Sequence, residues 1–388
     1  MLTTILMVLL LGLALLVAAG YALIRSRDMQ YWLPAYFASR QERRTRGSKS
    51  GEVTTVYVCV ADHYEPFFGG RVTPQQAAAR VDEWITTYPQ IASKHRDSSG
   101  RAPQHTFFYP LEEYDRATLD KLAALSRQGF GDVEVHYHHD NDTAEGLSRA
   151  LRDFTQTLHH QHGLLRIEPG TKDIAYCFIH GNWALDNSRP DGRWCGVNDE
   201  ITVLAQTGCR VDYTMPSAPS DTQTRKINSI YFARGKPGQC KSHDTGRDLK
   251  VGEWGQSPEL LMVQGPLGLN WKSRKLGLIP RIENGEISAD ARPTVDRVRL
   301  WLKLSPRIRG AEDHIFVKLH THGAVDSATK SLLGGDFDRM WTALEAQVRD
   351  RPGYRLRYVT AWEMYSIIKA IAAGARESAT PAVRTAHG

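Results

Sequence analysis

The chain has 388 residues, of which 41% are hydrophobic and 24% charged, a composition typical of a globular protein. Its net charge of +6 is concentrated, because residues 25–49 include seven basic residues against two acidic ones and the rest of the chain is nearly neutral. This distribution argues against a basic nucleic-acid-binding face, and five cysteines without a CxxC pair give no sign of a disulfide framework. We expect no nucleic-acid partner.

An uncharged run over residues 2–24, rich in Leu, Val and Ala, is long enough to cross a bilayer as a helix. A cleaved signal peptide is the alternative, with Ala18-Ala19-Gly20 as its cleavage site, but such a peptide begins with basic residues and only Met1 precedes this run. We therefore predict a single membrane anchor over 2–24, followed by a basic juxtamembrane segment and linker over 25–52. The arginines after the span favour a cytoplasmic location for the remaining chain over a periplasmic or extracellular one.

From residue 53 onward, strand and helix patterns alternate. Strands are predicted over residues 53–60, 106–109, 133–138, 174–180, 210–214, 260–263, 315–320 and 354–360. Helices are predicted over residues 73–88, 116–127, 143–162, 199–206, 294–302, 336–349 and 361–373. Such alternation predicts parallel strands joined by right-handed crossovers, and hence an α/β fold with a distorted (β/α)7-type barrel over 53–375. The small, polar residues 376–388 are predicted to be a disordered tail.

Polar and titratable residues follow nearly every predicted strand, while the strand bodies are apolar. Catalytic groups of parallel barrels collect at the carboxyl ends of the strands, so these residues form the candidate site. They are Asp62, His63 and Glu65 after the first strand, His136, His138, His139 and Asp142 around the end of the third, His180, Asn182 and Trp183 after the fourth, Asp212 in the fifth, and His320 and His322 in a later strand.

The stretch GDVEVHYHHDNDT predicts a metal site. Strand side chains alternate between faces, so His136 and His138 share one face while His139 takes the other. Asp142 lies one turn beyond His138 and can converge on the same point. Imidazole and carboxylate ligands suit Zn²⁺ or a similar divalent ion with one position left for water. The expected ligands are His138 and Asp142, completed by Asp62 or His63, with His136 as a ligand or an outer partner.

The stretch HTFFYPLEEYDRATLDKLAALSRQGFGDVEVHYHHDND (105–142) resembles the core of NodB-type polysaccharide deacetylases. That family has a short TFF strand, a helix with LxxLxxQG and a strand that ends in metal-binding histidines. Further segments resemble the family's first motif, its GYRVxxWD strand, its final LLH motif and its closing strand and helix: residues 61–66, 209–212, 316–322 and 354–365. The resemblance covers about residues 53–375.

The resemblance implies roles for these positions. Asp62 would be the catalytic base, His320 the general acid, and Asp212 a residue that orients a catalytic group. The implied cofactor is a divalent metal, Zn²⁺ by ligand type. Its implied ligands are His63, which stands where the family has Asp, His138, and Asp142, which stands where the family has His. The segment FIHGNWALDN replaces the family's RxPY motif, so His180, Asn182 and Trp183 are the candidate substrate-binding residues.

The implied function is metal-dependent deacetylation of acetylated sugars, by amide or ester hydrolysis, in cell-surface or exopolysaccharide metabolism. The expected partners are an acetylated polysaccharide or a lipid-linked oligosaccharide, and the lipid bilayer. One alternative is a glycoside hydrolase of the same barrel superfamily, with Glu65 and Asp212 as its carboxylate pair. Another is a catalytically inactive carbohydrate-binding barrel.

Overall fold

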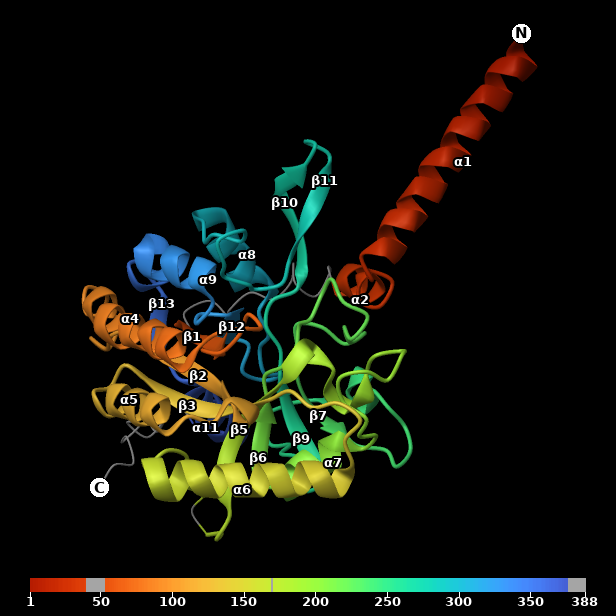
Figure 1. The fold of residues 1–388 in the computed structure, drawn as a ribbon. Coiled ribbons are helices and arrows are strands. Elements are labelled where there is room, and N and C mark those ends of the chain that lie inside the picture. Colours follow the sequence, from red (N-terminus) through yellow and green to blue (C-terminus); the bar gives the residue numbers. More distant parts are fainter. Residues whose placement is uncertain (40–52, 169, 376–388) are drawn as a thin grey trace.

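The computed structural model describes residues 1–39, 53–168 and 170–375 (Figure 1). Part of the predicted linker, residues 40–52, and the predicted disordered tail, residues 376–388, lie outside the described residues. Within the described residues, each predicted strand and helix is present, with boundaries shifted by a few residues. The expectation of a mixed α/β fold built on a large, mostly parallel sheet is confirmed.

An 11-stranded sheet forms the centre of the molecule. Its parallel strands follow the order β12-β1-β2-β3-β5-β6-β9. They are β1 (Thr54–His63), β2 (His105–Pro110), β3 (Gly131–Tyr137), β5 (Ile174–His180), β6 (Cys209–Asp212), β9 (Glu259–Val263) and β12 (His314–Thr321). A further parallel strand, β13 (Tyr354–Tyr358), pairs with the first half of β1. The antiparallel strands are β4 (Arg166–Ile167), β7 (Ile230–Arg234) and β8 (Arg247–Asp248).

Helices cover both faces of this sheet. One face packs against most of the helices, and the other packs against the apolar side of the last helix, α11. The helices are α4 (Pro74–Ala92), α5 (Arg116–Arg127), α6 (Ala144–His162), α7 (Glu200–Gln206), α8 (Val295–Leu304), α9 (Asp326–Ser331), α10 (Phe337–Leu344) and α11 (Ala361–Ala372). Capping boxes start α4 and α11, where Thr73 pairs with Gln76 and Thr360 with Glu363. Side chains at the first turn of each helix therefore satisfy its free N–H groups.

The parallel strands curve without closing into a barrel. Among residues 53–168 and 170–375, no strand ladder joins β12 to β9. Irregular backbone fills the gap instead: the His320 N–H donates to the Gly285 carbonyl at 3.0 Å, and the Ile287 N–H donates to the His320 carbonyl at 2.8 Å. On the other side of the gap Gly265 approaches β12 closely, since a Cβ at Gly265 would lie 2.6 Å from the Lys318 carbonyl oxygen. The sheet is therefore consistent with a distorted barrel.

The N-terminal helix α1 (Leu2–Ser26) has no buried residue and projects away from the body (Figure 1). By length and composition it qualifies as a membrane span, and by its place near the N-terminus it also qualifies as a signal sequence. The short helix α2 (Leu33–Ala38) follows it, and Trp32 between the two is fully buried against Leu267 and Leu269. Beside this contact, β10 (Gly268–Lys275) and β11 (Ile279–Glu283) form a separate hairpin, which the sequence patterns did not predict.

We expect Gly265→Ala to lower the free energy of unfolding by about 1–3 kcal/mol, because the added methyl group must displace the backbone of β12. The matched control is Gly334→Ala, where a Cβ would meet no atom within 4 Å. Chemical denaturation in detergent, followed by circular dichroism, compares the two variants. Equal midpoints would contradict the close approach that fills the barrel gap.

Candidate functional site

The carboxyl ends of β1 and β3 bring three side chains together in what we call the His63 site: His63, Glu65 and His136. All three are buried, and one ligand atom from each lies within 4.8 Å of the other two. His63 is the last residue of β1 and Glu65 follows two positions later, so the strand period places them on the same side. The structure thus joins the predicted ligands His63 and His136 to a carboxylate that the sequence analysis considered only for glycoside hydrolysis.

Hydrogen bonding leaves ring nitrogens of the His63 site available to an ion. The Nδ1 of His136 lies 2.8 Å from the Ile179 carbonyl oxygen and donates to it, so Nε2 faces Glu65 at 3.2 Å. Protonated, this Nε2 donates to Glu65; deprotonated, it presents a lone pair to an ion. Neither ring nitrogen of His63 makes a hydrogen bond within the described residues. Two imidazoles and one carboxylate are a donor set that fits Zn²⁺ or a similar divalent ion.

Two histidines from the end of β12 and one tryptophan surround His63. The His322 ring stacks on His63 with centroids 4.8 Å apart, and the His320 centroid lies at 6.3 Å. Trp183 lies 5.7 Å from both His63 and His322. Burial lowers the pKa of His63 and of His320 well below the usual value, and neighbouring cationic groups lower both further. Both rings are therefore neutral near pH 7.

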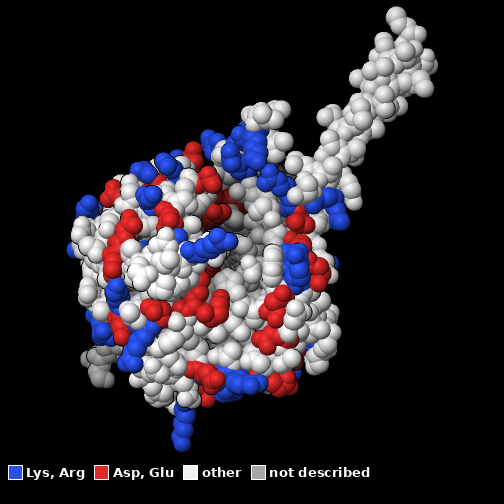
Figure 2. Space-filling view, viewed as in Figure 1, with Lys and Arg blue, Asp and Glu red and all other residues white. Residues whose placement is uncertain are grey.

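A more exposed histidine, His138, lies at the rim of the site. Its Nδ1 is 2.5 Å from Glu112 Oε1, and its Nε2 is 3.7 Å from Glu65 Oε1. Burial opposes protonation of His138, but the hydrogen bond to Glu112 and the charge of Glu65 outweigh it, so the pKa of His138 is raised. Nearby, burial raises the pKa of Glu113 to about 7, with a further contribution from Glu65 and Glu112. Figure 2 shows a hollow in the viewed face with acidic side chains around it.

The predicted base, Asp62, faces away from the His63 site. Its Oδ2 lies 2.8 Å from His105 Nε2, and its Oδ1 accepts the Gly323 N–H at 2.6 Å. Asp62 and His63 are neighbours in β1, so their side chains leave opposite faces of the strand. Both Asp62 oxygens are engaged, and through Gly323 the carboxylate holds the loop that follows His322. The sequence analysis missed His105, which carries no motif of its own.

The predicted orienting residue, Asp212, is not among the three side chains of the His63 site. Its two oxygens accept hydrogen bonds from the N–H and the hydroxyl of Thr214, at 3.0 and 2.7 Å. Burial raises the pKa of Asp212 to about 7, against the hydrogen bonds to Thr214 and the charge of Lys318. Burial likewise lowers the pKa of Lys318 to about 8.

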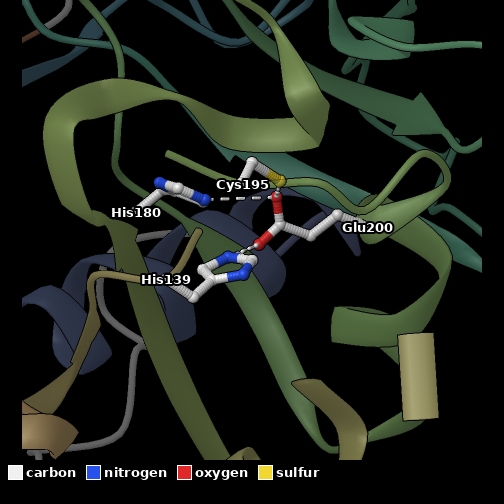
Figure 3. Close-up of side chains that lie close together, drawn as sticks. All are labelled: His139, His180, Cys195 and Glu200. Atoms are coloured by element: carbon white, nitrogen blue, oxygen red, sulfur yellow. Dashed lines mark hydrogen bonds and ion pairs between the residues drawn. The ribbon is translucent and has the colours of Figure 1, made fainter. Parts of the chain in front are cut away.

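A second buried group, which we call the Cys195 cluster, consists of His139, His180, Cys195 and Glu200 (Figure 3). The predicted substrate residue His180 is one of its members, and its Nε2 lies 3.4 Å from Glu200 Oε2. The predicted ligand Asp142 lies beside it, with Oδ2 3.2 Å from His139 Nδ1. Asp142 and His138 are thus oriented toward different groups. Asn182, in the turn after β5, has a φ of 52° and precedes Trp183.

No protein-family model matches this chain, and no curated protein matches it. Among solved structures, a GH57 branching enzyme from the hyperthermophilic archaeon Thermococcus kodakaraensis, in complex with glucose and additives, is similar to it at 11% sequence identity and a TM-score of 0.34. The alignment covers 76% of this chain and 68% of that chain. A likeness of this degree carries no argument about activity, so function is argued from the residues of this chain.

We expect Asp212 to make stability depend on pH. Between its usual pKa of 3.8 and its raised pKa of about 7, the folded protein keeps a proton that the unfolded chain has lost. Its contribution to stability therefore falls as pH rises through this window, by up to about 1.4 kcal/mol per pH unit. The Asp212→Asn variant should lose this dependence, while the exposed control Asp153→Asn should keep it. Denaturation midpoints at several pH values test this, and a constant difference between wild type and Asp212→Asn would contradict it.

Proposed function

We propose that the chain is a metal-dependent hydrolase that deacetylates sugars, with the His63 site as its catalytic centre. The observation that carries the proposal is the convergence of two imidazoles and a carboxylate at the carboxyl ends of parallel strands, beside His138 and His320. Active sites of parallel α/β folds lie at the carboxyl ends of the strands, and buried titratable groups with shifted pKa values are common in them. The resemblance to NodB-type deacetylases supplies the substrate class.

When bound at His63, Glu65 and His136, a divalent ion supplies Lewis-acid polarisation of a carbonyl and of water. The remaining chemistry falls to side chains around it. Glu112 accepts the Nδ1 proton of His138 and fixes this ring, so that His138 Nε2 faces the site and can take or give a proton. His320 is neutral and its Nδ1 has no hydrogen-bond partner, so this ring can first accept the proton released from water and then pass it to the leaving group.

Further residues position the substrate. Trp183 presents an aromatic ring near His63 and His322, and such a ring suits stacking against a sugar. Asp62 holds the loop after His322 through the Gly323 N–H, so we propose a positioning role for it beside the predicted role as base. Asn182, with its positive φ angle, forms the turn that orients Trp183 toward His63.

We propose that α1 is retained as a membrane anchor, with residues 25–52 as the link to a catalytic unit over 53–375. The substrate is then an acetylated polysaccharide at the cell surface or an oligosaccharide on a lipid carrier. The absence of any buried residue in α1 supports the anchor, since lipid would cover the apolar surface that this helix leaves exposed.

A second candidate function, glycoside hydrolysis, is favoured by two glutamates near His138. The pKa of Glu65 is lowered by its hydrogen bond to His136 and by nearby histidines, which outweigh burial, while the pKa of Glu113 is raised to about 7. Carboxylates with pKa values pushed apart are the pattern of a glycosidase acid and its partner. Glu113 takes the place of Asp212 in this pair, because the charge of Glu113 acts on His138 at the site, whereas both oxygens of Asp212 accept hydrogen bonds from Thr214.

The test compares acetate release from acetylated oligosaccharides with release of new reducing ends, using the full chain in detergent with added Zn²⁺. We expect acetate release that falls by about a hundredfold or more in His136→Ala and is unchanged in the exposed control His160→Ala. If new reducing ends form instead of acetate, and if the Glu113→Gln variant no longer forms them, the protein is a glycoside hydrolase and the deacetylase proposal is wrong. Binding of sugar with neither product would indicate an inactive carbohydrate-binding barrel.

A further inference from the structure

The Cys195 cluster is a second buried group of metal-binding side chains, and the proposed reaction makes no use of it. His139 follows β3, His180 ends β5, Cys195 lies in the loop between them and α7, and Glu200 begins α7 (Figure 3). One ligand atom from each lies within 4.8 Å of the others. Glu200 is central to the group: its oxygens lie 3.3 Å from His139 Nε2, 3.4 Å from His180 Nε2 and 3.3 Å from Cys195 Sγ.

One buried nitrogen of this cluster has no hydrogen-bond partner. His180 is fully buried and its Nδ1 lies 2.5 Å from the Gly181 carbonyl, yet its Nε2 has no hydrogen-bond partner. Buried polar atoms are almost always paired, so an unpaired imidazole nitrogen aimed at a carboxylate and a sulfur calls for a ligand. His180 also has the arrangement of a metal ligand, with its other nitrogen fixed by a carbonyl.

The sulfur of Cys195 is prepared for a cation in the same way. The backbone N–H groups of Asn187 and Val197 point at Sγ, at 3.3 and 3.4 Å. Burial and the charge of Glu200 raise the pKa of this thiol, which donates to Glu200, while the two N–H groups favour the thiolate, the form that binds a metal. Two imidazoles, one thiolate and one carboxylate are ligands of Zn²⁺, and four protein ligands in a buried place leave no open position for water.

The loop between β5 and α7, which carries Cys195, has an unusual backbone that an ion bound to this cysteine would help to hold. Six residues in it that are not glycine have positive φ angles: Asn182, Trp183, Asp186, Asn187, Trp194 and Asp199. Each such residue costs free energy, and a run of them persists only where the surroundings hold it firmly. The same loop carries Trp183 to the His63 site.

We propose that the Cys195 cluster binds a structural Zn²⁺ ion, which joins the ends of β3 and β5 to the start of α7 and so holds Trp183 in place. The ion is distinct from the one in the His63 site. His138 and His139 are adjacent in the chain and are oriented toward the two different groups.

X-ray absorption at the zinc edge tests this on the full chain loaded with Zn²⁺. The His63 site contains no sulfur, so a zinc–sulfur shell at about 2.3 Å reports the Cys195 cluster alone. We expect this shell in the wild type, in His136→Ala and in Cys240→Ser, an exposed cysteine that serves as the matched control. We expect it to disappear in Cys195→Ser.

Absence of the sulfur shell from the wild type, or its persistence in Cys195→Ser, would overturn the proposal without affecting the His63 site. Should Cys195→Ser fail to fold, the Co²⁺-substituted wild type decides the matter, because thiolate ligation gives a charge-transfer band that nitrogen and oxygen ligands do not. Without that band, the cluster is a hydrogen-bonded network around Glu200.

A second observation concerns the β10–β11 hairpin, which projects from the body on the same side as α1 (Figure 1). Its outer part exposes large apolar side chains, with Leu276 at 92% and Leu278 at 78% exposed. Basic side chains lie below this tip: Lys272, Arg274, Lys275 and Arg281. Figure 2 shows Lys and Arg side chains gathered on the side of the molecule from which α1 projects, with uncharged atoms protruding above them.

The hairpin has a fixed place beside the membrane helix. Buried Trp32 joins the end of α1 to Leu267 and Leu269 at the base of β10. A groove of about 750 Å³ lies between them, and Ile24 and Glu286 are among its lining residues. An apolar tip above a basic collar is the pattern of a segment that enters a bilayer with anionic headgroups.

We infer that the tip of this hairpin inserts into the same bilayer as α1, which rests on the proposal that α1 is a retained anchor. The groove then opens at the headgroup level. The backbone of its wall residue Glu286 forms an isolated parallel β-bridge with His320, whose ring centroid lies 6.3 Å from that of His63, so one wall of the groove adjoins the strand end that carries the His63 site. This geometry favours a sugar carried on a lipid over a soluble polymer.

The test places a fluorescent label on single cysteines in the full chain, in nanodiscs that contain spin-labelled quencher lipids. Cys240→Ser removes the exposed cysteine, and the remaining cysteines are buried. We expect quenching at Leu276→Cys and none at Asp153→Cys, an exposed site on α6. Quenching at Leu13→Cys without quenching at Leu276→Cys would overturn the hairpin insertion; no quenching at Leu13→Cys would show that the anchor itself fails.

Discussion

The site depends on the parallel pairing of β1 with its neighbours. In this register Asp62 lies opposite Thr321 of β12, and His63 lies opposite Phe108 of β2. Because the strands run the same way, their carboxyl ends reach one level together, and the residues just beyond them meet although they are far apart in sequence. The alternation of side chains then decides which neighbour each residue faces: His63 turns to the histidines and Asp62 to His105.

Burial is the second constraint on these groups. Imidazoles and carboxylates out of water lose solvation, and their charge states follow the partners that the fold supplies. Histidines around Glu65 outweigh burial and lower its pKa, whereas burial, with a smaller contribution from neighbouring carboxylates, raises the pKa of Glu113 to about 7. The segments after β1 and β2 therefore carry one carboxylate with a lowered pKa and one with a pKa raised to about 7.

The local patterns of the sequence predicted the framework well. Apolar runs located the strands, and the predicted helix starts at residues 73 and 361 lie within one residue of the observed starts of α4 and α11. The β10–β11 hairpin was missed, because its exposed half carries no apolar alternation toward a core. Local patterns also could not predict the gap between β9 and β12. Gly265 and Gly285 allow the chain to approach β12 there, and these contacts exist only in the folded protein.

The candidate site was predictable as a set of residues but less so as a geometry. The ends of the predicted strands identified His63, His136 and His138 as site residues. Local spacing also paired Asp142 with His138. In the structure, the loop after β3 instead orients Asp142 toward His139. Partners from distant segments, such as Glu112, Cys195 and Glu200, carry no motif and became visible only through their contacts. Their positions depend on the tertiary arrangement of loops, which no periodic signal encodes.

The central claim is that the His63 site binds a divalent metal ion. The most direct measurement is anomalous diffraction at the zinc absorption edge from crystals of the full chain loaded with Zn²⁺. The account predicts an anomalous peak enclosed by His63, Glu65 and His136, and no such peak in crystals of His136→Ala. Fully loaded crystals that show no peak at these three residues would contradict it.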